Sequence, residues 1–164
     1  MTKDTFGPTR YIVLLQSLRS SPDRLEAAVR SLPAEAHDWR PGEQDWSAHM
    51  LASHLAAAEA PFLKRLTRIA AEDRPSLPWF GPDLARPDSP DPLPAILARF
   101  RDEREHLLEF LSGLAPEDWE RPAVHETMGP TTLALQVQNL VNHDTEHLGQ
   151  LDVLLRDWDT RSHA

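Results

Sequence analysis

Seven prolines between residues 73 and 94 constrain the fold of this 164-residue chain more than any other feature. Proline has no backbone N–H and cannot continue a helix or a central strand, so this stretch predicts a long, stiff connection. On both sides of it, apolar residues recur at steps of three and four, which is the spacing of amphipathic helices. A connection of this length allows the helices that it joins to run parallel, as in a bundle with a crossover.

Four segments carry the helical spacing, at about residues 9–31, 47–72, 92–112 and 131–158. Ser20-Ser21-Pro22 is a helix-start signal within the first segment, so we expect a break or a sharp kink there. Pro61 predicts a kink in the second segment, and Ser47 is a suitable N-cap at its start.

No segment has the alternating period of a strand, and residues 114–130 are predicted to form a loop. The sequence therefore predicts an all-α fold: a four-helix bundle with a long proline-rich crossover between the second and third helices. We expect residues 1–164 to form a single domain.

Charge and composition exclude several classes of function. The net charge of -9 argues against nucleic acid or an anionic membrane surface as the main partner. The chain has no cysteine, so disulfides, thiolate metal ligands and a cysteine nucleophile are excluded. Because no apolar run approaches the ~20 residues of a membrane span and the N-terminus lacks a signal-peptide pattern, we expect a soluble, cytoplasmic protein.

Two histidines stand on the apolar stripe of the fourth segment. His143 and His147 are four residues apart, and they continue a row formed by Leu140, Leu151 and Leu154. Residues i and i+4 lie on one face of a helix, one turn apart, so both imidazoles should face the core and can hold one metal ion. The alternative is that they are buried side chains satisfied by hydrogen bonds.

Two further polar residues fall on inward-facing rows. His54 lies between apolar residues of the second segment, and Arg104 occupies a stripe position of the third. Three imidazoles from two facing helices can converge in the bundle, leaving an open coordination position as in catalytic sites. His54 alone is more simply a core residue, and Arg104 either pairs with a carboxylate across the bundle or binds an anionic substrate.

Four other residues are candidates for the surroundings of the site. Glu59 lies just over one turn beyond His54, so it is a candidate to support that ligand, and Trp46 and Met50 lie near the start of the second helix and either line a pocket or pack. His125 precedes the fourth helix and lies either near the mouth of the site or in a structural loop.

These residues together resemble a known family, the DinB-like superfamily, also called the YfiT-like metalloenzymes. The resemblance rests on the order and spacing of Trp46-Ser47, His54-Leu55 with Glu59, Arg104, Asp118-Trp119, His125 with Gly129, and His143-Asp144 with His147. It implies a four-helix bundle with a crossover, a homodimer, and a divalent nickel, zinc or iron ion held by His54, His143 and His147. It also implies a thiol-dependent transferase or isomerase that uses a low-molecular-weight thiol as co-substrate.

Three functions follow from these observations. A divalent metal ion at three imidazoles can lower the pKa of a thiol or of water, so the chain is expected to be either a small-molecule thiol transferase or a metal-dependent hydrolase. The third function is that of a non-enzymatic, stress-related bundle protein with a structural metal or none. The first two share the same three ligands, so the histidines alone do not separate them.

Overall fold

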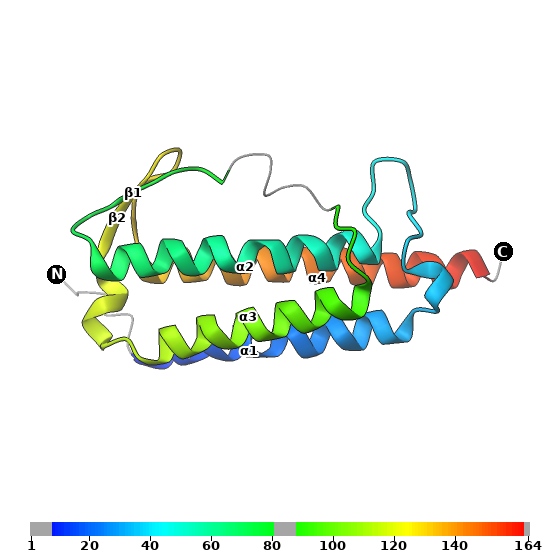
Figure 1. Cartoon of the computed structure of the whole chain (residues 1–164), viewed down its shortest axis with the longest axis horizontal. Coiled ribbons are helices and arrows are strands. Elements are labelled where there is room, and N and C mark those ends of the chain that lie inside the picture. The colour runs from blue at the N-terminus through cyan, green and yellow to red at the C-terminus, as the bar shows by residue number, and fades with distance from the viewer. Residues whose placement is uncertain (1–7, 81–87, 163–164) are drawn as a thin grey trace.

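The computed structural model describes residues 8–80 and 88–162, and it confirms the four-helix bundle (Figure 1). The long helices are α1 (Pro8–Ser31), α2 (Ala48–Ala71), α3 (Leu93–Ser112) and α4 (Leu133–Ser162). Two short 3-10 helices, η1 (Ala34–Ala36) and η2 (Pro116–Glu120), lie in the connections. None of the described helices is long and apolar enough to cross a membrane.

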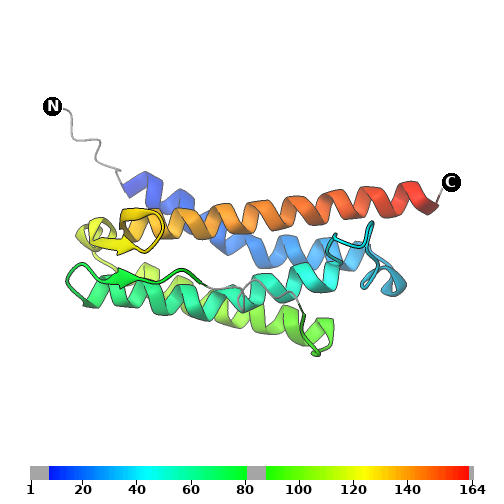
Figure 2. The same ribbon diagram turned by 90° about the horizontal axis from the view of Figure 1, so that it is seen from above.

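The direction of the helices is set by the crossover. In the bundle α3 starts near the end at which α2 starts, so the two helices run parallel (Figures 1 and 2). In the same way α1 and α4 run parallel, and the packed pairs α1–α3 and α2–α4 are antiparallel. The prediction of parallel helices on either side of the proline-rich stretch is therefore confirmed.

Ser47 caps α2 as predicted, because its hydroxyl accepts a hydrogen bond from the backbone N–H of Met50 at 3.2 Å. The prediction of a break at Pro22 is wrong, since α1 is a single helix that contains this proline. Pro61 lies within a continuous α2, and the kink predicted there stays a prediction. Each proline costs its helix one hydrogen bond, but packing of the apolar stripe over many turns outweighs that loss.

The prediction that residues 114–130 form only a loop is also wrong. A small sheet contains β1 (Ser76–Leu77), β2 (Pro122–His125) and β3 (Gly129–Thr132), with β1 parallel and β3 antiparallel to β2. Gly129 follows the β2–β3 turn at φ 75°, a conformation that glycine adopts without strain. Strands of two to four residues are too short to show a period, and their pairing depends on segments that are distant in the sequence.

A polar layer divides the hydrophobic core into two halves. One half lies where α1 and α4 begin, and its largest members include Leu18, Phe62, Leu66, Leu107, Trp119 and Leu140. The other half lies where α2 and α3 begin, and includes Leu25, Leu51, Leu55, Ile96, Phe100 and Leu151. Between them each long helix contributes a buried polar side chain: Ser21, Glu59, Arg104 and Asp144. The histidines lie beside this layer.

Candidate metal centre

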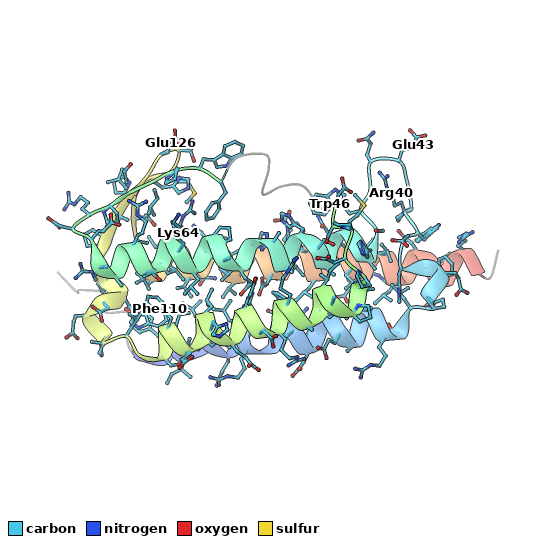
Figure 3. All side chains as sticks on the ribbon, in the orientation of Figure 1. Arg40, Glu43, Trp46, Lys64, Phe110 and Glu126 are labelled. Carbon is cyan, nitrogen blue, oxygen red and sulfur yellow. The ribbon has the colours of Figure 1, made fainter. Side chains whose placement is uncertain are left out.

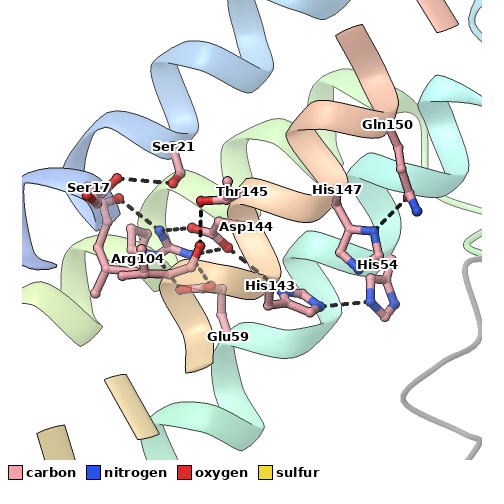
Figure 4. Close-up of polar contacts among 12 residues, drawn as sticks. Ser17, Ser21, His54, Glu59, Arg104, His143, Asp144, Thr145, His147 and Gln150 are labelled. Carbon is pink, nitrogen blue, oxygen red and sulfur yellow. Dashed lines mark hydrogen bonds and ion pairs between the residues drawn. The ribbon is translucent and has the colours of Figure 1, made fainter. Parts of the chain in front are cut away.

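Three histidines converge between the antiparallel helices α2 and α4. His54 comes from α2, and His143 and His147 come from successive turns of α4 (Figure 4). One nitrogen from each imidazole lies within 4.8 Å of the other two. His54 and His147 are buried, and His143 is half-buried. The convergence predicted from the helical spacing is therefore present in the structure.

The donor set and its spacing fit a divalent transition metal. The Nε2 atoms of His54 and His143 are 2.8 Å apart, so one donates a hydrogen bond to the other. Two nitrogens that bind the same tetrahedral zinc at ~2.0–2.1 Å lie roughly 3.3 Å apart, so small side-chain rotations accommodate an ion. Neutral imidazole suits zinc, iron and nickel, and three such ligands leave a coordination position open.

Gln150 fixes the orientation of His147. The Nδ1 atom of His147 lies 2.9 Å from Oε1 of Gln150 and donates to it, because an amide oxygen can only accept. The lone pair of His147 is then on Nε2, the other ring nitrogen. Burial lowers the pKa of His147, and the neighbouring His143 adds to this effect while the Gln150 hydrogen bond opposes it. The neutral, metal-binding form of the ring is therefore favoured.

Two aromatic rings enclose the imidazoles. Trp46 stacks on His147 with ring centroids 5.6 Å apart, and its ring meets His54 edge-on at 5.0 Å. Phe62 lies 6.4 Å from His143 by ring centroids. These contacts limit the rotation of the imidazoles and keep water from much of their surface, which strengthens electrostatic interactions in the site.

Arg104 makes five hydrogen bonds in the polar layer beside the histidines (Figure 4). Its Nε and Nη2 atoms donate to the two carboxylate oxygens of Glu59 at 2.8 and 2.6 Å. Nη1 and Nη2 donate to Asp144 at 2.7 and 3.2 Å, and Nη1 also donates to the carbonyl of Leu18 at 2.8 Å. A guanidinium has five N–H donors, so its capacity is fully used, and residues of all four helices are joined.

The carbonyl of Leu18 is available to Arg104 because of Pro22. In an α-helix the carbonyl of residue 18 accepts from the N–H of residue 22, and proline has none. The proline thus leaves a buried acceptor on the inner face of α1, and the guanidinium satisfies it. This pairing accounts for a proline inside a continuous helix.

The layer carries one more negative charge than positive when both carboxylates are ionised. Burial raises the pKa of Glu59, against the opposing effect of Arg104. Burial also acts to raise the pKa of Asp144, but His143, Arg104 and Ser21 outweigh it, so that the pKa of Asp144 is lowered. Asp144 Oδ1 lies 3.8 Å from His143 Nδ1, too far for a hydrogen bond but close enough for its charge to favour a cation at the centre.

Two of the residues predicted to surround the site lie next to it, one in contact with the histidines and the other in the polar layer. Trp46 covers the histidines, and Glu59 directs both of its oxygens at Arg104. Arg104 pairs with carboxylates across the bundle, which confirms that alternative for it.

The structure places the other two candidates differently. Met50 is half-buried in the first turn of α2 and is not among the residues that line the cavity next to His147. The Nδ1 atom of His125 accepts hydrogen bonds from the backbone N–H groups of Thr127 and Met128, so this ring supports the β2–β3 turn. Glu126, the residue after His125, lies far along the bundle from Trp46 in Figure 3, so the β2–β3 turn is not beside the metal centre.

Sequence reasoning assigned no role to Asp144, beyond its place in the family resemblance, and did not single out Gln150. Asp144 had a signal, because Leu140 and Leu148 stand one turn before and after it and are buried. A carboxylate on such a row predicts a buried ion pair. Gln150 is exposed and three residues beyond His147, and nothing in its position separates it from other surface amides.

Comparisons with known proteins support this architecture. The sequence profile of the DinB superfamily matches residues 17–151. A protein from Oceanobacillus iheyensis, named as a candidate metal-dependent hydrolase, is 23% identical over 143 residues, covering 86% of this chain and 83% of its own length.

Solved structures share the fold. YfiT from Bacillus subtilis, described as a candidate metal-dependent hydrolase with an unusual four-helix bundle topology, superposes with a TM-score of 0.81 at 19% identity, covering 95% of this chain and 91% of its own. A DinB-like protein from the same organism has a TM-score of 0.65 at 16% identity, covering 89% and 91%. One from Bacillus cereus has a TM-score of 0.61 at 20% identity, covering 87% and 89%.

Proposed function

This chain belongs to the DinB superfamily, and from that premise we propose that it is a metal-dependent enzyme that transfers a small-molecule thiol to an electrophile. The observation that carries the proposal is the convergence of three imidazole nitrogens, within 4.8 Å of one another, beside a cavity of about 460 Å³ lined by His147. A divalent ion held by these histidines would supply Lewis-acid chemistry that lowers the pKa of a bound thiol or water.

The residues of the chain supply binding and orientation. His54, His143 and His147 would hold the ion, and Gln150 sets the tautomer of His147. Trp46 excludes water from one side of the centre. In the transfer step the thiol releases its proton to solvent, its sulfur bonds to the electrophilic carbon, and the leaving group departs with the electrons of the broken bond.

The state of Asp144 removes the carboxylate beside His143 as a base for hydrolysis. Hydrolysis gains from a side chain that accepts a proton from the attacking water. The carboxylate beside His143 is Asp144, but its oxygens accept from Arg104 and its pKa is lowered, so it is a weak base. A thiol, whose ordinary pKa is near 8.5, requires less assistance to ionise than water does.

Hydrolysis is the second candidate, because the relative from Oceanobacillus iheyensis and YfiT are both described as candidate metal-dependent hydrolases. The two reactions are separated by turnover of a chloronitrobenzene with and without added low-molecular-weight thiol, beside turnover of a nitrophenyl ester. Thiol-dependent release of chloride supports transfer. Ester cleavage that is indifferent to thiol refutes transfer and supports hydrolysis.

The metal itself is tested by elemental analysis of protein purified without a nickel column. We expect about one divalent ion per chain. We expect that ion to be lost in each of His54→Ala, His143→Ala and His147→Ala. An Ala substitution at His106, which is exposed on α3, is the matched control. Full metal content in all three variants refutes the site.

The choice among nickel, zinc and iron, and the homodimer implied by the family resemblance, remain predictions. Growth-medium metal substitution followed by turnover assays tests the first, and analytical ultracentrifugation of the purified chain tests the second. If the centre binds metal but supports neither reaction and has no exchangeable position, the non-enzymatic alternative replaces the proposal.

A further inference from the structure

A cavity next to the histidines lies between a loop and α4. Its volume is about 460 Å³, and His147 forms part of its wall together with the stacked ring of Trp46. The loop before α2 forms one side, and the second half of α4 forms the other. The complete lining is Pro41, Gln44, Asp45, Trp46, Leu51, His147, Gln150, Val153, Leu154 and Asp157. A small molecule in this cavity contacts the centre directly through His147.

The lining combines an apolar body with negative charge. Trp46, Leu51 and Leu154 are among its apolar members. Asp45 from the loop and Asp157 from α4 belong to its two sides, and no lysine or arginine of the described residues is part of the lining. Such a surface favours a ligand with an apolar part and a positive charge, and it disfavours anions.

The two carboxylates have no direct ion-pair partner among the described residues. Among residues 8–80 and 88–162, neither Asp45 nor Asp157 takes part in a salt bridge. Arg40 is on the same loop, but its Nε donates to the backbone carbonyl of Asp45 at 2.7 Å and not to the carboxylate. Gly42 leaves room for the Asp45 carboxylate, since a Cβ at this position would meet Oδ2 at 2.9 Å.

We propose that this cavity is the substrate site of the metal centre and that it selects a small organic cation. The ligand has an apolar portion against Trp46 and Leu154 and an ammonium group facing Asp45 and Asp157. This inference rests on the proposed function for the reaction, but the selectivity for positive charge depends only on the lining of the cavity. The arginines and lysines in residues 8–80 and 88–162 lie outside that lining.

The test uses three probes that share an aromatic ring and differ in charge. Benzyltrimethylammonium is a permanent cation without a lone pair, so it cannot coordinate a metal ion. Benzyl alcohol is the neutral comparator and benzenesulfonate the anion. Binding to the full-length, zinc-loaded protein is measured by titration calorimetry at low ionic strength, and the bound region is located from amide chemical shifts around His147.

We expect the cation to bind more tightly than the alcohol and the sulfonate to show no saturable binding. In the double variant Asp45→Asn/Asp157→Asn, affinity for the cation should fall roughly three- to thirtyfold while affinity for the alcohol is unchanged. Asp159→Asn is the matched control, because Asp159 is exposed on α4 and lies outside the lining. Equal affinities for cation and alcohol in the native protein, or an unchanged affinity for the cation in the double variant, would overturn the inference.

The metal content of the same samples separates this inference from the proposed function. If the protein retains zinc and turns over a thiol but binds no cation, the selectivity is refuted and the enzyme assignment stands. If the protein holds no metal yet binds the cation in a manner that depends on Asp45 and Asp157, the charge selectivity of the cavity is supported and the metal-dependent function is refuted.

Discussion

Replacing Arg104 with methionine removes a cation that two buried carboxylates share. Arg104 is 1% exposed, and it holds Glu59 and Asp144 through bidentate pairs. Methionine fills a similar volume but donates no hydrogen bond, so both carboxylates remain buried without their partner. Breaking a buried pair in this way costs about 3–5 kcal/mol. For a chain of this size the melting temperature should fall by roughly 6–20 °C.

Pro22 provides an internal check on that magnitude. The Arg104→Met variant also leaves the Leu18 carbonyl without its hydrogen-bond donor, which costs about 1 kcal/mol or more of folding free energy. Pro22→Ala restores an N–H that can donate to this carbonyl within α1. The Arg104→Met substitution should therefore cost about 1 kcal/mol less in the Pro22→Ala background, which a double-mutant cycle measures.

The assay is urea denaturation of metal-free protein near pH 7, monitored by the circular dichroism signal of the helices. Arg101→Met is the matched control, because Arg101 lies on the same helix but pairs at the surface with Asp23 and Glu26. A surface pair contributes about 0–1 kcal/mol, so this variant should differ little from the native protein. If Arg104→Met loses no more stability than Arg101→Met, the polar layer does not contribute to the fold as we argue.

Three further predictions concern the centre. Gln150→Ala should weaken zinc binding about 10- to 100-fold in a competition titration, because His147 loses its orienting acceptor, whereas Gln138→Ala on the same helix should not. Trp46→Phe should abolish most of the fluorescence quenching that a paramagnetic ion such as nickel causes, since the Trp46 ring stacks on His147. Burial raises the pKa of Glu59, so this carboxyl contributes stability at low pH that is lost as the pH rises through the raised pKa. Glu59→Gln should therefore lower the free energy of unfolding more near pH 5 than near pH 8 in urea denaturation. The reverse order would contradict the direction of the pKa shift.

The spacing of residues along the sequence determined the helices of this protein and the shared face of two of its three site histidines. The i, i+4 spacing of His143 and His147 places both rings on one face of any helix, whatever surrounds it. The cap at Ser47 and the apolar stripes likewise depend on residues within one or two turns. The proline-rich stretch excludes a helix, which left a crossover between parallel helices as the consistent arrangement. The prediction that it excludes every regular element is wrong, because the two residues of β1 (Ser76–Leu77) pair with β2 at the edge of the small sheet.

Tertiary packing decided the rest, because it joins groups that are distant in the sequence. Whether Arg104 faces a substrate or a carboxylate depends on the groups that the other three long helices present to it. These groups belong to Leu18, Glu59 and Asp144, which are 86, 45 and 40 residues away in the sequence. Pro22 signals a helix break by its local properties, yet the Arg104 guanidinium satisfies the carbonyl that it frees, so the helix continues. The stacking of Trp46 on His147 and the two-sided cavity likewise exist only once the loop before α2 packs against α4.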